Sequence, residues 1–240
     1  MIRKLSVLII MFSTIQAFAA SQSMPLDSVL VDLNNKSSLQ RGAQIYMNNC
    51  LGCHTLKYQR YVKFVDHLEL SKETIENNLI FTTNKSGEKT KIGSLILNSI
   101  NTDHATEAFG VMPPDLTLIA RSRGADWLYT FLRSFYIDES RPLGVNNSLY
   151  SNVGMPHVLA WMEGLKVQSS VEGKYEYISE GVMNQQEYDR AIADLVNFLV
   201  YVSEPAQLDR YRIGFWVILF LGIFLFVALL LKNEYWKDVK

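Results

Sequence analysis

Two cysteines and a histidine stand together near the start of the chain, in the run Cys50-Leu51-Gly52-Cys53-His54. These are the only cysteines among the 240 residues. A Cys-x-x-Cys pair can form a disulfide, act as a redox-active dithiol, supply half of a zinc site or attach a haem covalently. The adjacent histidine favours haem attachment, because two thiols about one helical turn apart can bond the two vinyl groups while the imidazole reaches the iron.

The surroundings of this motif disfavour the other chemistries. A thioredoxin-like dithiol follows a strand, whereas residues 38–47 lead into the motif with the apolar spacing of a helix. A zinc site needs a second cysteine pair or a histidine pair at finger spacing, and the sequence contains neither. We therefore predict one haem c bound covalently through Cys50 and Cys53, with His54 as an axial ligand of its iron.

The second axial ligand is less determined by the residues. The candidates are Met47, Met112, Met155, Met162, Met183, His67, His104 and His157. Met112 and Met155 stand out because each precedes a proline, which disfavours helical geometry at the methionine and favours an extended loop. The pattern of residues leaves these two nearly even, and the ordinary role of any single methionine is to fill the core.

The first nineteen residues have the order of a secretory signal peptide. Arg3 and Lys4 precede an apolar stretch, which ends in the small-x-small pattern Ala17-Phe18-Ala19. We expect cleavage after Ala19. The chain that follows is then exported, and residues 20–212 are predicted to form a periplasmic domain.

A second apolar stretch lies near the end of the chain. Residues 213–231 carry no charge, and their number is close to the ~20 residues that a helix needs to cross a bilayer. A buried helix of a soluble protein usually keeps a polar stripe, which this segment lacks. We predict one transmembrane anchor helix over 213–231, a cytoplasmic tail over 232–240, and attachment to the bacterial inner membrane.

Composition and charge restrict the class of protein further. With 48% hydrophobic and 20% charged residues, the chain is neither disordered nor a multi-span transporter. Leaving out Arg3, Lys4 and the charges of residues 232–240 changes the formal net charge from −1 to −4. A mildly acidic exported domain is poorly suited to nucleic acid and better suited to a basic protein partner.

The domain between the two ends is predicted to be all-α with long loops. Asp126 resembles an N-cap, and the apolar residues after it share one helical face: Trp127, Leu128, Phe131, Leu132 and Phe135. Asn184 and Glu187 have the spacing of a capping box at the start of a terminal helix, which we expect to join the anchor past Pro205. Residues 63–100 lack clear periodicity, and we expect them to form a solvent-exposed loop.

Several segments, taken in order, resemble cytochrome c1, the haem subunit of the ubiquinol:cytochrome c reductase (bc1) complex. They are Cys50-Leu51-Gly52-Cys53-His54, Met112-Pro113-Pro114-Asp115-Leu116 with the arginines after it, Asp126-Trp127-Leu128, Gly154-Met155-Pro156, and Glu204-Pro205 before the C-terminal anchor. The resemblance covers nearly the whole mature chain. It implies a cytochrome c-type haem domain with one C-terminal transmembrane helix.

The resemblance also implies roles for individual residues. Met155 is the expected second axial ligand, and Pro113 belongs to a segment that packs on the haem. Arg123 and Arg121 match arginines near the haem propionates. His157 departs from the small or apolar residue that many members of the family carry after the Met-Pro pair.

The function implied is that of a membrane-anchored carrier of single electrons. Its donor would be a Rieske iron–sulfur protein, its acceptor a soluble or membrane cytochrome c, and its neighbour in the membrane cytochrome b. No catalytic acid or base is expected, so the chain would be no enzyme on its own. Two alternatives remain: an anchored mono-haem cytochrome that serves another reductase or oxidase, and a haem-based sensor with an open sixth iron position.

Overall fold

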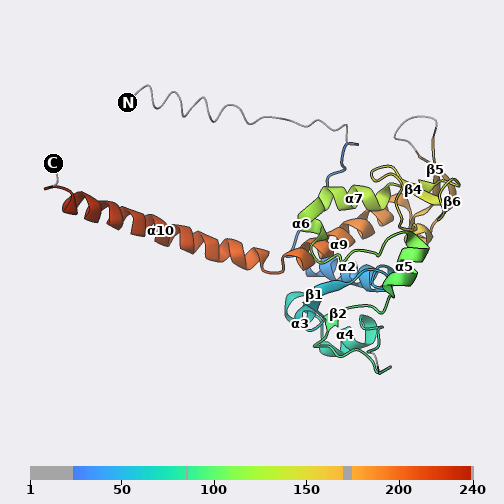
Figure 1. Cartoon of the computed structure of the whole chain (residues 1–240), viewed down its shortest axis with the longest axis horizontal. Helices are drawn as coiled ribbons and strands as arrows, with labels where there is room; N and C mark the ends of the chain where they lie inside the picture. Colours follow the sequence, from blue (N-terminus) through green and yellow to red (C-terminus); the bar gives the residue numbers. More distant parts are fainter. Residues whose placement is uncertain (1–23, 85, 170–174, 239–240) are drawn as a thin grey trace.

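Helices are the main regular structure of the computed structural model, which describes residues 24–84, 86–169 and 175–238 (Figure 1). The helices are α2 (Lys36–Asn49), α3 (Lys63–His67), α4 (Lys72–Asn78), α5 (Thr102–Phe109), α6 (Ile119–Arg123), α7 (Ala125–Arg133), α8 (Ala160–Glu163), α9 (Gln185–Ser203) and α10 (Gln207–Tyr235). The predicted all-α class is confirmed for the bulk of the domain. The predicted signal peptide, residues 1–19, lies outside the described residues.

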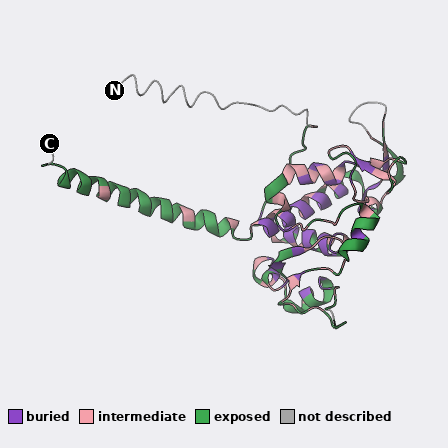
Figure 2. Ribbon diagram, viewed as in Figure 1, coloured by how far each residue is buried: buried purple, intermediate pink, exposed green. Residues whose placement is uncertain are grey.

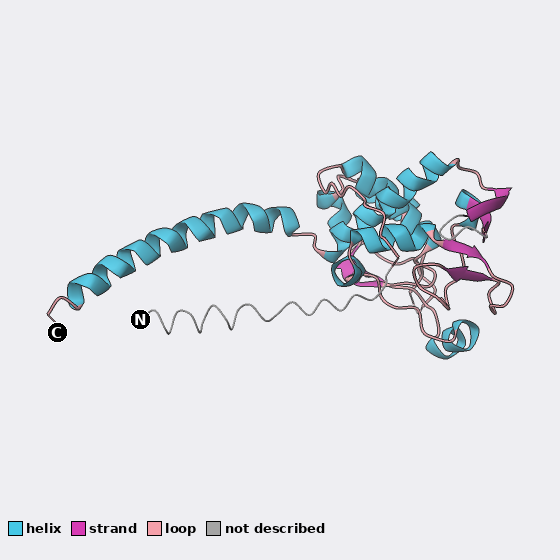
Figure 3. Cartoon of the chain, turned by 90° about the horizontal axis from the view of Figure 1, so that it is seen from above, coloured by secondary structure: helices cyan, strands magenta, loops and turns pink. Residues whose placement is uncertain are grey.

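Within the described residues, short strands form three antiparallel pairs. They are β1 (Leu56–Arg60) with β2 (Leu95–Ile96), β3 (Phe135–Ile137) with β4 (Val145–Asn147), and β5 (Gly164–Gln168) with β6 (Tyr175–Glu180). Figure 3 shows most of these strands as short arrows at the end of the domain away from the C-terminal helix. No strands were expected, because strands this short carry too few residues for a clear alternation of apolar and polar positions. Phe135, expected on the helix after Asp126, instead begins β3, because α7 ends at Arg133.

The core is centred on α2 and α9, which pack against each other, while α6 and α7 pack on α9. Asn35 caps α2, since its side chain accepts a hydrogen bond from the Ser38 amide at 3.1 Å. The predicted capping box at the start of α9 is confirmed: the Glu187 amide donates to Asn184 Oδ1 at 3.0 Å, and the Asn184 amide donates to Glu187 Oε2 at 2.9 Å. Figure 2 shows that the buried residues gather where these helices meet.

The close contact between α2 and α9 depends on Gly42. A Cβ atom added at Gly42 would lie 2.1 Å from the carbonyl oxygen of Asp194 and 2.7 Å from Cβ of Phe198. A backbone oxygen cannot move aside as a flexible side chain can. The missing side chain at this position therefore sets how closely the two central helices approach.

We predict that Gly42→Ala destabilises the protein by about 2 kcal/mol, the typical cost of overpacking a close contact. The measurement is the urea midpoint of unfolding at constant slope. Gly93→Ala is the matched control, because an added Cβ at Gly93 meets no atom within 4 Å. The control should change stability by less than about 0.5 kcal/mol. Equal midpoints for the two variants would contradict the role assigned to Gly42.

The segment 63–100 is not the solvent-exposed loop that the sequence analysis expected. It contains α3, α4 and β2, and six of its apolar side chains are buried in the core: Phe64, Leu68, Ile75, Leu79, Ile80 and Ile96. The Phe64 ring packs on Phe198 of α9, with the ring centroids 5.7 Å apart. Because the apolar residues are widely spaced and the helices are short, the pattern has no clear period although the segment builds part of the core.

Asp126 has a different role from the N-cap that was predicted. It lies in the first turn of α7, and the N-cap position is Gly124, which has a φ of 92°. The Asp126 carboxylate accepts a hydrogen bond from the Val29 amide at 2.9 Å. The carboxylate thus fastens the extended segment before α2 to α7, a contact between residues far apart in the sequence.

The last helix, α10, projects from the domain (Figure 1). Among the described residues it is the helix long and apolar enough to cross a membrane, and none of its residues is buried. It begins just after Pro205, as predicted, and contains the whole predicted span 213–231. Its length and apolar composition make α10 the candidate membrane span among the described residues, as the sequence predicted.

Candidate haem site

The Cys50-x-x-Cys53-His54 motif forms a tight turn at the end of α2. Cys50 is the C-cap residue of the helix, and its carbonyl oxygen accepts from the Cys53 amide at 3.1 Å and from the His54 amide at 2.8 Å. The two thiols therefore lie about one helical turn apart, as the sequence predicted. The two cysteines form no disulfide with each other.

The environment of Cys50 disfavours a redox-active dithiol. Burial raises the pKa of its thiol to about 12, and the nearby Cys53 adds to this shift. Reactive dithiols have the opposite property, a lowered pKa that yields thiolate at neutral pH. No three His, Cys, Asp or Glu side chains gather as a metal-binding group in the part of the chain that the structure describes. The turn consequently fits covalent attachment better than thiol exchange or a zinc site.

The His54 ring is oriented by the Pro-Pro-Asp segment. Its Nδ1 lies 2.8 Å from the carbonyl oxygen of Pro114, and since a carbonyl oxygen can only accept, Nδ1 is the donor. The other ring nitrogen, Nε2, then carries the lone pair that could bind a metal ion. Burial lowers the pKa of His54, although the bond to Pro114 opposes this shift, and a neutral ring is the form that binds iron.

The backbone around His54 is fixed by two further contacts. The buried Tyr46 hydroxyl donates to the His54 carbonyl oxygen at 2.8 Å. The Leu116 amide donates to the Thr55 carbonyl oxygen at 2.9 Å, which joins the chain after His54 to the Pro-Pro-Asp segment. The imidazole is thus fixed from both its ring and its main chain.

Asp115 holds these two segments together. Its carboxylate accepts hydrogen bonds from Thr55 Oγ1 at 2.6 Å, from the Lys57 amide at 2.7 Å and from the Thr117 amide at 3.1 Å. Partial burial raises the pKa of Asp115, but the hydrogen bonds from Thr117, Thr55 and Lys57 outweigh it and hold the pKa below its ordinary range. The ionised carboxylate is therefore the form that the fold stabilises.

We predict that Asp115→Asn destabilises the protein at pH 7 by roughly 1 to 2 kcal/mol, since charge-assisted hydrogen bonds become neutral ones or are lost. The wild-type advantage is present above the unfolded pKa of about 3.9 and is lost as the pH falls through the lower folded value. Urea unfolding at several pH values between 7 and 3 measures this difference. Asp66→Asn, at an exposed carboxylate on α3, is the control. A constant difference between wild type and Asp115→Asn across this range would contradict the assignment.

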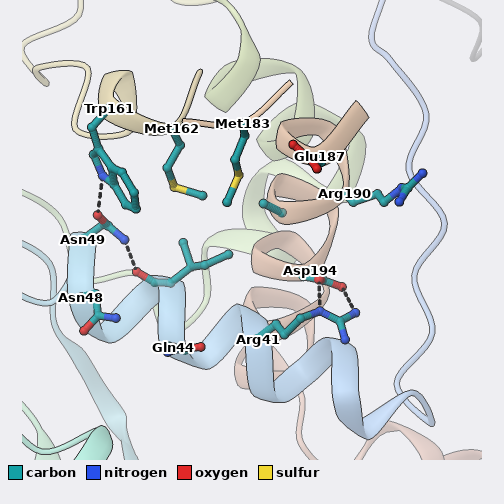
Figure 4. Close-up of a pocket in the computed structure, with 12 residues that line it drawn as sticks. Arg41, Gln44, Asn48, Asn49, Trp161, Met162, Met183, Glu187, Arg190 and Asp194 are labelled. Carbon is teal, nitrogen blue, oxygen red and sulfur yellow. Dashed lines mark hydrogen bonds and ion pairs between the residues drawn. The ribbon is translucent and has the colours of Figure 1, made fainter. Parts of the chain in front are cut away.

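Two of the candidate methionines, Met47 and Met162, lie in the core, and Met183 packs against it. Met47 is buried on α2. Met162 and Met183 line a pocket between α2 and α9, together with Ile45 and Ala191 (Figure 4). These residues fill space between helices, which is the ordinary role of methionine.

The loops that carry Met112 and Met155 lie side by side. A Cβ added at Gly154 would be 2.7 Å from the carbonyl oxygen of Phe109 and 3.9 Å from Cγ1 of Val111. The Met112 loop continues to Pro114, whose carbonyl oxygen binds His54. Both methionines are partly buried. The structure therefore places the Met155 loop against the chain just before Met112, and the Met112 segment reaches the Nδ1 side of the His54 ring through Pro114.

The two arginines of α6 have different surroundings. The Arg123 guanidinium lies over the Trp127 ring, 5.1 Å from its centroid. Arg121 Nη1 is 3.7 Å from Glu204 Oε2 at the end of α9, and both arginines are exposed. Pro113, between Met112 and Pro114, is partly buried. Arg121 thus faces the start of the anchor, and Arg123 faces the aromatic side chains of α7.

Some residues of the site were missed by the sequence analysis. The Pro-Pro-Asp segment was identified, but the pattern did not indicate that the Pro114 carbonyl orients His54 or that Asp115 bonds Thr55 and Lys57. A buried group around Glu163 was also missed. The useful signals were a carboxylate directly after two prolines and the pair Glu163 and Lys166, which lie three residues apart beside Trp161.

Residues 27–239 match the profile of the Cytochrome C1 family. The chain belongs to this family. It is 45% identical over 225 residues to cytochrome c1 of Allochromatium vinosum, covering 89% of each chain. It is 41% identical over 236 residues to the ammonia monooxygenase gamma subunit of Nitrosomonas europaea, covering 98% of each chain. Cytochrome c1 of Blastochloris viridis is 23% identical over 240 residues, with 86% of this chain and 82% of the relative covered.

Membership in this family confirms the resemblance that the sequence predicted. The family carries a c-type haem and transfers electrons, so both properties belong to this chain. The turn at Cys50, the two cysteines and the oriented His54 ring fit such a group, because they provide two sulfur atoms and one nitrogen donor at adjacent positions.

Proposed function

We propose that the chain is the membrane-anchored haem subunit of a bc1 complex, taking single electrons from a Rieske iron–sulfur protein and passing them to a cytochrome c. The supporting observation is the Cys50–His54 turn, whose imidazole is oriented by Pro114 of the family's Pro-Pro-Asp segment. The high identity to cytochrome c1 of Allochromatium vinosum, over most of both chains, supports the same assignment.

In this proposal Cys50 and Cys53 would hold one haem c through thioether bonds, and His54 Nε2 and the Met155 sulfur would bind its iron. When bound, the haem supplies reversible one-electron chemistry, because its iron cycles between the ferrous and ferric states. A methionine opposite a histidine favours the ferrous state and raises the potential. Pro114 and Asp115 keep the imidazole in one orientation, so little rearrangement accompanies the change of charge.

The two exposed arginines belong to the proposal as well. Arg123, fixed over Trp127, is proposed to pair with a propionate of the haem. Arg121 is proposed to contribute to the same charge balance while its guanidinium also lies near Glu204. Pro113 is proposed to contact the haem. No acid or base of this chain makes or breaks bonds in such a transfer, so catalysis of quinol oxidation would belong to the assembled complex.

The topology proposed has a periplasmic haem domain over residues 20–212, an anchor over 213–231 and a cytoplasmic tail over 232–240, after removal of residues 1–19. The α10 helix would pack against cytochrome b in the membrane, which would cover part of its exposed apolar surface. The net charge of −4 outside the membrane and tail favours a basic acceptor, whose approach should slow as salt rises.

Co-purification from mildly solubilised membranes tests this assignment. We expect the tagged chain to bring with it a b-type haem and an iron–sulfur protein. Recovery with the subunits of another oxidoreductase would favour an anchored cytochrome of a different complex, a possibility raised by the name of the Nitrosomonas relative. If the chain is recovered without other subunits and its ferrous haem binds carbon monoxide rapidly, the sensor alternative would be favoured.

A further inference from the structure

A group of four polar side chains, three of them buried, begins two residues after Met155. It consists of His157, Glu163, Lys166 and Tyr177 and is called the Glu163 cluster below. The side chains of His157, Glu163 and Lys166 are only 6%, 1% and 4% exposed. Burying charged groups is costly unless they are paired and hydrogen-bonded, so such a cluster needs a structural or functional reason.

Glu163 is the centre of this cluster. Its Oε1 pairs with the Lys166 ammonium, and the Tyr177 hydroxyl, which donates to Gln185 Oε1 at 2.5 Å, lies 3.2 Å from the same carboxylate oxygen. Lys166 also donates to the Arg133 carbonyl oxygen at 2.7 Å. Lys166 contacts Oε1, so the other carboxylate oxygen of Glu163 can accept from a second side chain.

That second side chain is His157. Its Nε2 lies 2.9 Å from Glu163 Oε2, so the ring donates a charge-assisted hydrogen bond. One face of the imidazole stacks on the Phe135 ring, with the ring centroids 5.0 Å apart and the planes 1° from parallel. The ring is therefore fixed in direction by Glu163 and in plane by Phe135.

The helix that carries Glu163 is itself attached to the haem turn. Trp161, two residues earlier on α8, donates from its indole nitrogen to Asn49 Oδ1 at 3.1 Å (Figure 4). Asn49 is the last residue of α2, directly before Cys50. At the other end of the loop, Gly154 lies against the Phe109 backbone. Met155 thus lies between two contacts that fix its loop. Before it, Gly154 packs on Phe109; after it, His157 is bonded to α8, which is bonded in turn to Asn49 beside the attachment turn.

We propose that Glu163 and His157 are positioning residues for Met155: the carboxylate fixes the imidazole two residues after the methionine and so keeps the sulfur at the iron. This inference rests on the proposed role of Met155 as an axial ligand. A proline after Met155 keeps the loop extended, but it does not determine where the loop lies relative to Cys50. The Glu163 cluster fixes the position of the loop relative to Cys50, because α8 is bonded to Asn49.

Two variants at His157 separate the hydrogen bond from the shape of the side chain. His157→Phe keeps the stacking on Phe135 and the volume but removes the donor, whereas His157→Gln keeps a donor within reach of Glu163. We expect His157→Phe to lower the ratio of methionine-bound to methionine-free iron by about tenfold, the effect of losing a hydrogen bond to a charged group. In His157→Gln we expect a ratio close to that of the wild type.

The readouts are the near-infrared methionine–iron band of the oxidised protein, the rate of carbon monoxide binding to the ferrous protein, and hydrogen exchange at the Val158 and Leu159 amides. The whole membrane-bound chain is used. Met155→Leu, measured in parallel, identifies the spectrum of the protein without its sulfur ligand. Asp194→Asn, which breaks the ion pair with Arg41 on the α2–α9 face, is the control and should change none of the three.

A second pair of variants tests the carboxylate without leaving an unpaired buried charge. Glu163→Leu/Lys166→Met removes the acceptor, and Glu163→Gln/Lys166→Met keeps an amide oxygen in its place. Only the first should weaken the band and speed carbon monoxide binding, and this pair decides the question if His157→Phe fails to accumulate.

Wild-type spectra in both His157→Phe and Glu163→Leu/Lys166→Met would overturn the inference. It would also fail if His157→Gln and Glu163→Gln/Lys166→Met weakened the methionine–iron band as much as those two variants do. If Met155→Leu itself keeps the band, the proposed ligand is wrong instead.

Discussion

Met155→Leu is expected to abolish the near-infrared methionine–iron band and to lower the reduction potential by a few hundred millivolts, within the ~0.8 V range over which axial ligands set the potential of haem. Leucine has nearly the volume of methionine, so the loop can keep its packing while the sulfur is lost. Without this ligand the ferric form becomes relatively more stable, and the ferrous form gains an open position. Redox titration and carbon monoxide binding measure the two effects.

Met112→Leu is the matched control for this experiment. Met112 also precedes a proline and lies in the adjacent loop, but its segment binds the Nδ1 side of His54 through Pro114. The family resemblance makes Met112 a neighbour of the haem and Met155 the iron ligand. We expect Met112→Leu to keep the band and the potential. The assignment of Met155 fails if Met112→Leu, and not Met155→Leu, removes the band.

The second large effect is expected at the cysteines. In Cys50→Ala/Cys53→Ala we expect complete loss of covalently attached haem, because thioether bonds form through these two sulfur atoms and the chain has no other cysteine. Haem staining after denaturing electrophoresis measures this, since only covalently bound haem remains with the chain. Each single Ala variant should retain stain through its remaining sulfur.

Met47→Leu is the control for packing at this site. Met47 is buried on α2 close to Cys50, and the replacement conserves its volume. Full staining is expected there, which would show that a change in the core of α2 does not by itself prevent attachment. Stain that persists in Cys50→Ala/Cys53→Ala would mean that the haem is not held through these thiols.

The features that sequence could predict are local ones. The turn from Cys50 to His54, the capping box at Asn184 and the apolar anchor are each defined by neighbouring residues, and the structure places them as expected. The wrong expectations concern contacts between distant residues. Asp126 caps no helix because its carboxylate bonds Val29, a partner 97 positions away. Residues 63–100 belong to the core because α3 packs on Phe198.

The candidate site shows the same division. The residue types that could bind haem were readable, since Cys50, Cys53 and His54 carry their chemistry in a single motif. What orients them was not readable: the Pro114 carbonyl is a backbone atom, and the Asp115 carboxylate acts on Thr55 and Lys57 across about 60 residues. The choice between Met112 and Met155 came from the resemblance, because a proline after each gave them equal local geometry.

The most direct test of the central claim is electron transfer through this chain in its own complex. The complex is isolated from mildly solubilised membranes through a tag on this chain, mixed rapidly with a quinol, and followed by the absorbance of the c-type haem. We expect the quinol to reduce the haem and an added basic cytochrome c to reoxidise it, with both steps lost in Met155→Leu or greatly slowed. A c-type haem that quinol does not reduce, in a preparation lacking b-type haem and an iron–sulfur protein, would contradict the account.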